Sequence, residues 1–207
     1  RIQTFQIFQM DWWDLQGRLH IVSKGNLLTI GYSTLSKRVS GIKFLDSFAN
    51  LVVIQNPDNE SFSLPPKVIT SIELKNKGVA KSRNAVIENT HTEYLLFGDD
   101  DIEFKEETIN AAIAHLEANK DISILLLQAV DETGALRKRY PKQKHSLKLT
   151  NSAKAATYEM IIRVNDFKRA AISFDENFGA GAQNYLGDEY IFIADALRAG
   201  LKGYYLP

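Results

Sequence analysis

The stretch EYLLFGDDD, residues 93–101, decides the fold of this chain. Its apolar part, residues 94–97, has the length of a short buried strand and ends at a glycine. Three carboxylates follow with no cation between them, so another group must compensate their mutual repulsion. Side chains alternate along a strand, which places Asp99 and Asp101 on one side and Asp100 on the other. Asp99 and Asp101 can therefore share one ligand, and a hard divalent cation is the common partner of such a pair.

The acidic triplet has a second interpretation as a solvated turn between a strand and a helix. Glu106 and Glu107 then lie near a helix N-terminus, where negative charge is favourable. The triplet alone leaves both interpretations open. If it binds a ligand, it does so beyond the carboxyl end of a buried strand, which is where open α/β sheets hold their ligands.

The composition is that of an ordinary globular protein, with 44% hydrophobic and 24% charged residues among 207. The 25 basic and 25 acidic residues leave no net charge, so we expect no nucleic-acid partner. Cysteine is absent, which excludes disulfides and fits a reducing compartment. No apolar run reaches the ~20 residues that cross a membrane. We therefore expect a cytoplasmic protein, and peripheral association with the inner face of a membrane is allowed for.

Strand-like and helix-like segments alternate along the first part of the chain. Apolar runs predict strands at residues 27–32, 51–54, 68–74, 94–97 and 122–129. Helical spacing predicts helices from Ser36 to about Phe48, over 80–88 and over 106–119. This alternation predicts an α/β fold with a doubly wound, mainly parallel central sheet and helices on both faces.

The last third of the chain has a different character. It contains a basic stretch at 137–144, a short strand at 160–164, a Gly- and Asn-rich loop at 174–187 and a final helix at 188–199. The basic stretch either meets phosphates of a donor or an anionic acceptor, or is a solvated face. We accordingly divide the chain into a lead-in segment, 1–26, and two halves of one domain, 27–130 and 131–207.

Four segments, in this order, resemble the signatures of family 2 glycosyltransferases of the GT-A fold, bacterial polysaccharide type. They are Asn76-x-Gly78 with Ser82-Arg83-Asn84, the triplet with Phe97 and Gly98, the loop 174–181 with Gly187-Asp188-Glu189, and the closing residues 198–207. The resemblance covers roughly residues 27–207. It implies that 27–130 bind the nucleotide sugar and that 131–207 form a smaller acceptor-side region, truncated at its C-terminus.

The resemblance implies sugar transfer from a nucleotide-diphosphate sugar, with a UDP-sugar favoured, to a saccharide or lipid-linked acceptor. A diphosphate leaving group needs a Lewis acid on its oxygens, which Mn²⁺ or Mg²⁺ supplies. Asp101 is the implied direct metal ligand, and Asp99 contacts the metal, its bound water or the ribose. The implied donor-binding residues are Tyr32, Ser33, Asn56, Arg83, Asp99, Asp100 and Gly181. Asn56 stands where the family often has an acidic residue, which leaves the identity of the base open.

A carboxylate at the start of the final helix is the implied general base, which takes the proton of the acceptor hydroxyl. The family usually has Glu followed by Asp, whereas this chain has Asp188 followed by Glu189. Alignment favours Glu189, while residue type and the shorter side chain slightly favour Asp188, so both are candidates. Asp188 has a second interpretation as a helix N-cap. Inversion at the anomeric carbon is implied by the resemblance.

The reversed acidic pair also motivates an alternative function, a non-catalytic descendant of this fold that binds a nucleotide or glycan. A nucleotidyltransferase ranks below both, because no Gly-rich phosphate loop follows the first strand. The sugar, the acceptor and the oligomeric state stay open.

Overall fold

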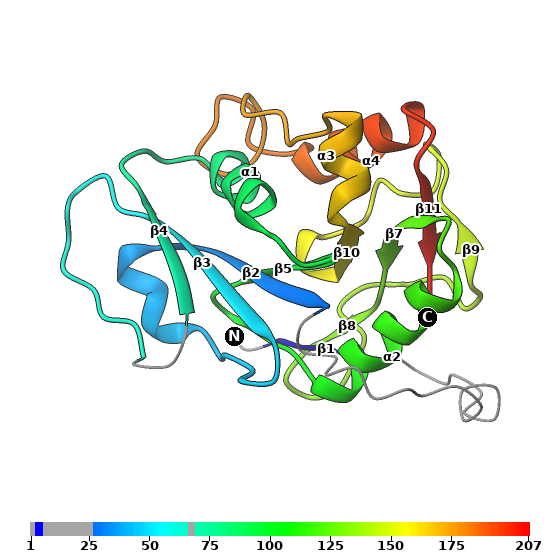
Figure 1. Cartoon of the computed structure of the whole chain (residues 1–207), viewed down its shortest axis with the longest axis horizontal. Coiled ribbons are helices and arrows are strands. Elements are labelled where there is room, and N and C mark those ends of the chain that lie inside the picture. Colours follow the sequence, from blue (N-terminus) through cyan, green and yellow to red (C-terminus); the bar gives the residue numbers. More distant parts are fainter. Residues whose placement is uncertain (1–2, 6–26, 66–68) are drawn as a thin grey trace.

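The structure is a computed structural model that describes residues 3–5, 27–65 and 69–207 (Figure 1). Its central sheet contains β2 (Leu28–Leu35), β3 (Ala49–Gln55), β4 (Ile69–Leu74), β5 (Tyr94–Asp99), β7 (Ile122–Leu126), β9 (His145–Ser146), β10 (Met160–Arg163) and β11 (Lys202–Tyr205). These strands lie in the order β4-β3-β2-β5-β10-β7-β11-β9. A small sheet of order β6-β1-β8 is formed by β1 (Gln3–Phe5), β6 (Ile102–Glu103) and β8 (Ala129–Val130).

Helices cover both faces of the central sheet. The α-helices are α1 (Val79–Asn89), α2 (Glu106–Ala118), α3 (Val164–Ala170) and α4 (Asp188–Arg198), and the short 3₁₀ helices are η3 (Ser36–Gly41) and η4 (Thr157–Glu159). Helix α2 packs on one face, and α1, α3 and α4 pack on the other (Figure 1). The predicted α/β architecture is therefore confirmed.

The buried strands supply a separate core to each face, because successive side chains point to opposite sides. In β3, Val52 and Ile54 pack with the α2 face, whereas Leu51 and Val53 pack with the α1 face. On the second face, Phe174 and Phe192 stack with ring centroids 4.0 Å apart. This stacking fixes α4 against the sheet and so fixes the position of the residues at its N-terminus.

The direction of one central strand interrupts the parallel sheet. Strands β4, β3, β2 and β5 pair in parallel, but β10 is antiparallel to both of its neighbours, β5 and β7. Because the direction reverses twice, β7 runs with β5, and β11 is parallel to β7. The carboxyl ends of β2, β3, β5, β7 and β11 therefore lie at the same edge of the sheet.

Several predicted elements differ from those observed. The helix predicted from Ser36 to about Phe48 is wrong, since η3 ends at Gly41 and the chain turns to an extended conformation at Ile42. A Cβ at Gly41 would lie 3.0 Å from the Asp100 carbonyl oxygen, so this turn is shaped by close contact with the acidic triplet. The strand predicted over residues 122–129 divides into β7 and β8, which belong to different sheets.

Helix α3 and the short strands β6 and β9 were not predicted. Of the predicted lead-in segment 1–26, only Gln3–Phe5 is described, as β1, and the remainder lies outside the described residues. Within the described ranges, no helix combines the length and the hydropathy that crossing a membrane requires.

Candidate functional site

A cavity of about 370 Å³ opens at the carboxyl ends of β2, β3 and β5. Parallel pairing brings these ends together, because Ser33 lies between Val53 of β3 and Asp99 of β5. The start of α1 and the loop residues Ala180 and Gly181 form the opposite wall. This is the position where open α/β sheets bind ligands.

The acidic triplet is divided between two environments: Asp99 and Asp100 separate as strand alternation predicts, but Asp101 lies beyond the end of β5 and shares Arg38 with Asp100. Asp100 is buried, accepts a hydrogen bond of 2.7 Å from Thr34 Oγ1 and forms an ion pair with Arg38. Asp99 lies on the other side, with Oδ1 3.9 Å from Nη2 of Arg83. Asp101 is the most exposed of the three, at 45% against 32% for Asp99, and its Oδ2 is 3.6 Å from Nη2 of Arg38. The triplet is thus tied to the protein by two arginines and is not a freely solvated turn.

The pKa values of two of these carboxyls are raised. Burial raises the pKa of Asp99, the nearby negative charges add to the rise, and Arg83 opposes it. Burial likewise raises the pKa of Asp100, while Thr34 and Arg38 hold it down. Burial thus favours the protonated form of both carboxyls, and the arginines favour the ionised form.

Arg83 links the triplet to the start of α4. Its guanidinium is buried, forms an ion pair with Asp188 and lies 3.5 Å from Glu189 Oε1. The same guanidinium lies over the Phe174 ring, 5.5 Å from its centroid. Burial raises the pKa of Asp188 to about 6, and Glu189 adds to the rise, while Arg83 lowers it. A basic residue predicted only from a short signature is therefore the centre of the acidic cluster.

Asp188 and Glu189 differ in accessibility. The Asp188 side chain is 5% exposed, whereas that of Glu189 is 27% exposed. Glu189 Oε1 accepts a hydrogen bond of 3.0 Å from Thr157 Oγ1. The interpretation of Asp188 as an N-cap is wrong, because Gly187 is the N-cap of α4 and Asp188 is the first helical residue.

Two glycines let the loop after β10 and α3 approach the site. Gly179 has φ +93°, and a Cβ there would lie 2.7 Å from Val79 Cγ1 and 2.8 Å from Asp188 Cγ. Gly181 has φ +84°, and a Cβ there would lie 3.2 Å from the backbone nitrogen of Gly78. The Val79 amide donates a 2.9 Å hydrogen bond to the Ala180 carbonyl. Because both positions need a positive φ and open space, only glycine fits the contact between loop and helix.

Three consecutive residues of η4 contact the acidic cluster on one side and the basic stretch on the other. Thr157 binds Glu189, as described above. Tyr158 accepts a hydrogen bond from Arg137, and its pKa is raised by burial and by the charges of Glu159, Asp99 and Asp101. Glu159 is buried and binds Lys138 and Tyr140. This segment therefore joins the acidic cluster to the basic stretch.

The remaining predicted donor-binding residues are not all at the cavity. Ser33 lines it, and its Oγ is buried without a hydrogen-bond partner among the described residues. Tyr32 points into the core, where its hydroxyl donates to the Lys43 carbonyl at 3.3 Å. The Asn56 side chain stabilises its own turn: its Nδ2 donates to the Glu60 carbonyl, and its Oδ1 accepts from the Glu60 amide. Tyr32 and Asn56 therefore shape the surroundings of the cavity and do not line it.

Four polar residues that line the cavity were not among the predicted donor-binding residues: Thr34, Arg38, Gln55 and Lys77. Gln55 Oε1 accepts from the Gly78 amide at 2.8 Å, and its Nε2 donates to Ser82 Oγ at 3.0 Å, which joins β3 to α1. The position of Gln55, directly after the predicted strand 51–54, was the sequence signal that it could reach the site. Nothing in the sequence distinguished Arg38 from an ordinary surface arginine.

The donor set at the cavity fits a hard divalent cation. Five carboxylates face two paired guanidiniums in this region: Asp99, Asp100, Asp101, Asp188 and Glu189 against Arg38 and Arg83. No group of three or more acidic or His side chains within the described residues is arranged to enclose a metal ion by itself. Mg²⁺ is commonly held by only one or two carboxylates together with substrate phosphates. Asp99 and Asp101 at the cavity suit that mode.

The mixed sheet, its helices on both faces and the acidic cavity at the strand ends define a GT-A type α/β domain. The chain belongs to glycosyl transferase family 2, whose model matches residues 59–177. No curated protein sequence matches the chain at a significant level.

Solved structures of similar fold include residues 1–349 of S. aureus TarS in complex with UDP-GlcNAc, at 16% identity and a TM-score of 0.60, over 87% of this chain and 56% of that one. The mannosyltransferase PcManGT from Pyrobaculum calidifontis, in complex with GDP-Man and Mn²⁺, is similar at 12% identity and a TM-score of 0.52, over 87% of this chain and 54% of that one. The chain thus spans a little over half the length of these structures, and at such identities the likeness concerns the fold.

Proposed function

We propose that this chain carries the catalytic site of a glycosyltransferase that moves a sugar from a nucleotide-diphosphate sugar, favoured as a UDP-sugar, to a saccharide or lipid-linked acceptor. The observation that carries the proposal is the contact of Arg83 with both Asp99 and the Asp188–Glu189 pair. It joins a donor-side carboxylate to a carboxylate suited to act as a base. The family membership and the two nucleotide-sugar complexes of similar fold support it.

In the proposed arrangement the donor lies in the cavity at the strand ends. Asp101 and Asp99 would hold Mn²⁺ or Mg²⁺, which supplies Lewis-acid stabilisation of the diphosphate leaving group. Ser33, with its buried and unpartnered hydroxyl, and Gln55 lie where a base or ribose would meet the ends of β2 and β3. Gly181 gives the donor room beside the start of α1.

Glu189 is the proposed general base. Its carboxylate is the more exposed of the pair, and Thr157 and Arg83 fix its direction. It takes the proton of the acceptor hydroxyl while the acceptor oxygen bonds to the anomeric carbon and the bond from that carbon to the diphosphate oxygen breaks, which inverts the configuration. Asp188 is buried against Arg83 and Gly179, so we assign it the positioning of Arg83.

We further propose that the reaction takes place in the cytoplasm, at the inner face of a membrane if the acceptor is lipid-linked. The cysteine-free sequence is compatible with a reducing compartment.

Calorimetric titration with UDP and with GDP tests the donor assignment. Each nucleotide is titrated into the wild type and Asp101→Asn with Mn²⁺, with Mg²⁺ and with EDTA. We expect metal-dependent binding of one nucleotide, with UDP the tighter, and at least tenfold weaker binding to the variant because a metal ligand is lost. Binding that is equal with EDTA and with metal would remove the cation from the proposal. Binding of neither nucleotide would remove the donor site itself and leave the glycan-binding descendant as the function to test.

A further inference from the structure

One segment of this neutral chain concentrates positive charge. Residues 137–154 contain seven Lys or Arg residues and no Asp or Glu: Arg137, Lys138, Arg139, Lys142, Lys144, Lys148 and Lys154. Five of them form no ion pair within the described part of the chain: Arg139, Lys142, Lys144, Lys148 and Lys154. Like charges crowded without counterions repel one another, so the segment attracts an anion.

Two of the unpaired cations stand at a cavity of about 390 Å³, Arg139 and Lys154. The cavity is lined below them by apolar and aromatic groups, among them Leu126, Leu147 and Tyr205. The acidic residue in its wall, Glu159, is buried and is neutralised by Lys138 at 2.6 Å. The cavity therefore combines an apolar interior with a positively charged rim.

The walls of this cavity are fixed by hydrogen bonds within the protein. The Tyr140 hydroxyl accepts from the Ala129 amide at 3.0 Å and donates to Glu159. The Tyr205 hydroxyl donates to the Pro141 carbonyl at 3.0 Å and accepts from Gln128 Nε2 at 2.6 Å. The cavity is thus held open without a ligand, which reduces the entropy lost on binding.

The cavity lies beside the proposed reaction centre. Leu126 and Tyr205 end β7 and β11, at the sheet edge where Asp99 ends β5. Glu159, in the cavity wall, directly follows two residues that face the acidic cluster. Thr157 donates a hydrogen bond to Glu189, and the charges of Asp99 and Asp101 contribute to the raised pKa of Tyr158. A molecule held here is therefore separated from the acidic cluster only by the residues of η4.

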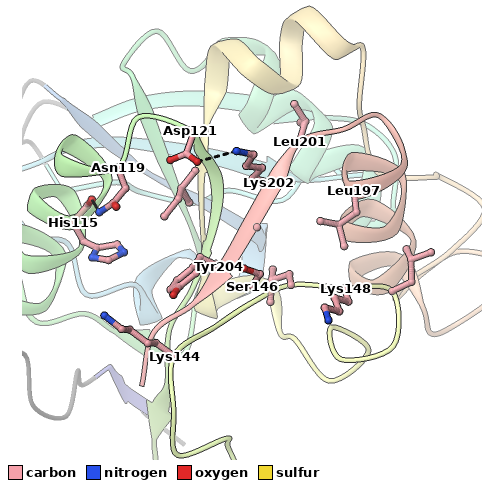
Figure 2. A pocket seen from close by; sticks show the side chains of 14 residues that line it. His115, Asn119, Asp121, Lys144, Ser146, Lys148, Leu197, Leu201, Lys202 and Tyr204 are labelled. Atoms are coloured by element: carbon pink, nitrogen blue, oxygen red, sulfur yellow. Dashed lines mark hydrogen bonds and ion pairs between the residues drawn. The ribbon is translucent and has the colours of Figure 1, made fainter.

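A second cavity, of about 660 Å³, lies in a different place (Figure 2). It is at the other ends of β7 and β11, where Ile122 and Lys202 begin these strands. Lys202 is neutralised there by Asp121 at 3.0 Å, as Figure 2 shows. Its position at the far edge of the sheet separates it from the reaction centre.

We propose that the cavity at Arg139 and Lys154 binds the acceptor, and that this acceptor is an amphiphilic phosphate ester whose saccharide carries the attacking hydroxyl. The proposal rests on the proposed function, because it names the acceptor of that same site. Arg139 and Lys154 bind the phosphate oxygens at the rim, where charge-assisted hydrogen bonds are strong. The apolar interior takes the hydrocarbon part next to the phosphate.

Calorimetric titration with octyl phosphate, below its critical micelle concentration, tests this assignment. We expect it to bind the wild type at least tenfold more tightly than octanol or inorganic phosphate, because only octyl phosphate fills both the rim and the interior. Arg139→Gln/Lys154→Gln should weaken octyl phosphate binding about tenfold. Lys142→Gln is the matched control, since Lys142 is in the same segment but does not line this cavity. It should stay within twofold of the wild type.

Several results would overturn the proposal. They are no binding of octyl phosphate, equal binding of inorganic phosphate, unchanged binding to the double variant, and an equal loss in Lys142→Gln. Sedimentation with vesicles of phosphatidylcholine and anionic phosphatidylglycerol adds a further arm, which measures binding to a negatively charged membrane surface. Vesicle binding without octyl phosphate binding assigns the charge to a membrane surface and overturns the acceptor site. UDP titration of the same variants should be unchanged, and its failure in the wild type would count against the donor site alone.

Discussion

At the scale of single residues, Arg83 determines how the acidic groups of the site are distributed. It is buried with Asp188, and it lies within 3.9 Å of both Glu189 and Asp99. A buried guanidinium is stable only when carboxylates compensate its charge, and buried carboxylates likewise need a cation. The arginine thus allows several carboxylates to stay close together in a partly buried place.

Separate substitutions of the two carboxylates at the start of α4 distinguish their roles. Glu189→Gln should lower the transfer rate by about 10²–10⁴-fold, because it removes the proposed base. Its nucleotide affinity should stay within twofold, since Glu189 does not line the donor cavity. Steady-state kinetics with calorimetry measures both quantities.

Asp188→Asn is the companion variant. It should retain most of the turnover, because the amide keeps a hydrogen bond from Arg83 while the base is untouched. Loss of turnover in Asp188→Asn together with retained turnover in Glu189→Gln would exchange the two roles. Turnover retained by both variants would exclude this pair as the source of the base.

The raised pKa of Asp188 predicts a specific pH dependence of stability. The folded-state pKa is about 6, above the ordinary value of 3.8. The folded protein therefore holds a proton that the unfolded chain has lost between these two values. The contribution of Asp188 to stability should be greatest below about pH 4 and should be lost as the pH rises to about 6.

Urea unfolding of the wild type and Asp188→Asn between pH 4 and pH 6.5 measures this contribution, over a range set by the two pKa values. The stability of the wild type relative to the variant should fall with rising pH, by at most about 1.4 kcal/mol per pH unit for one proton. A relative stability that rises over this range would show that the pKa of Asp188 is depressed instead.

Residue-level expectations from strand geometry held for Asp99 and Asp100 but failed for Asp101, which lies beyond the end of β5 and shares Arg38 with Asp100. Alternation predicted that Asp99 and Asp100 face different partners, and they do. Tyr32 precedes the end of β2 and is buried in the core, whereas Ser33 and Thr34 lie closer to that end and line the cavity. Arg38 could not be predicted, because it reaches Asp100 from a 3₁₀ turn whose length depends on contacts between segments distant in sequence.

At the scale of elements, the contact between the 174–187 loop and α1 shapes the donor cavity. The Val79 amide, at the start of α1, is bound by the Ala180 carbonyl. This hydrogen bond satisfies one of the free amides of the helix N-terminus. It also explains why glycines flank Ala180, since any side chain would displace the loop from the helix.

Alanine substitutions at two glycines test this contact. Gly179→Ala should lower the free energy of unfolding by about 3 kcal/mol, because backbone strain adds to a clash with Val79 and Asp188. Gly134→Ala is the matched control, with φ +84° but no atom within 4 Å of the new Cβ. It should cost only the strain, about 1 kcal/mol. Equal losses in urea unfolding would mean that the close approach does not contribute.

Element-level expectations failed where tertiary contacts override local pattern. The apolar residues after Ser36 do enter the core, among them Val39, Ile42 and Phe48, but they do so from a turn and an extended segment. Helix α3 has seven residues, which is too short for helical spacing to be clear. The reversed direction of β10 could not be predicted from sequence. All four of its residues are buried, so its hydrophobic pattern does not distinguish a parallel from an antiparallel strand.

At the scale of the whole molecule, the central strands β2, β5 and β10 join two halves that bind different substrates in the proposed function. Each is paired on both sides, and their core residues Ile30, Leu96 and Ile161 are fully buried. The edge strand β9 pairs only with β11 and has two residues. Stability should therefore be unevenly distributed along the sheet.

Native-state hydrogen exchange measures this distribution. Amides of β5 and β10 should exchange only through global unfolding, whereas those of β9 should exchange through local opening, by at least about a hundredfold faster. The difference follows from the single pairing and the exposure of β9. Equal protection of β9 and β5 would show that the segment around the basic cavity is part of the rigid core.

The three contacts of η4 have a consequence for how this protein can change. Thr157, Tyr158 and Glu159 each serve a different neighbour, so their spacing matters as much as their identity. One inserted or deleted residue would rotate all three side chains onto the wrong partners at once, whereas a point substitution would disturb only one. Loops elsewhere on the surface can change in length, but the number of residues in η4 is constrained by these three contacts. Variation in substrate preference should therefore arise by exchange of side chains around η4 and not by changes in its length.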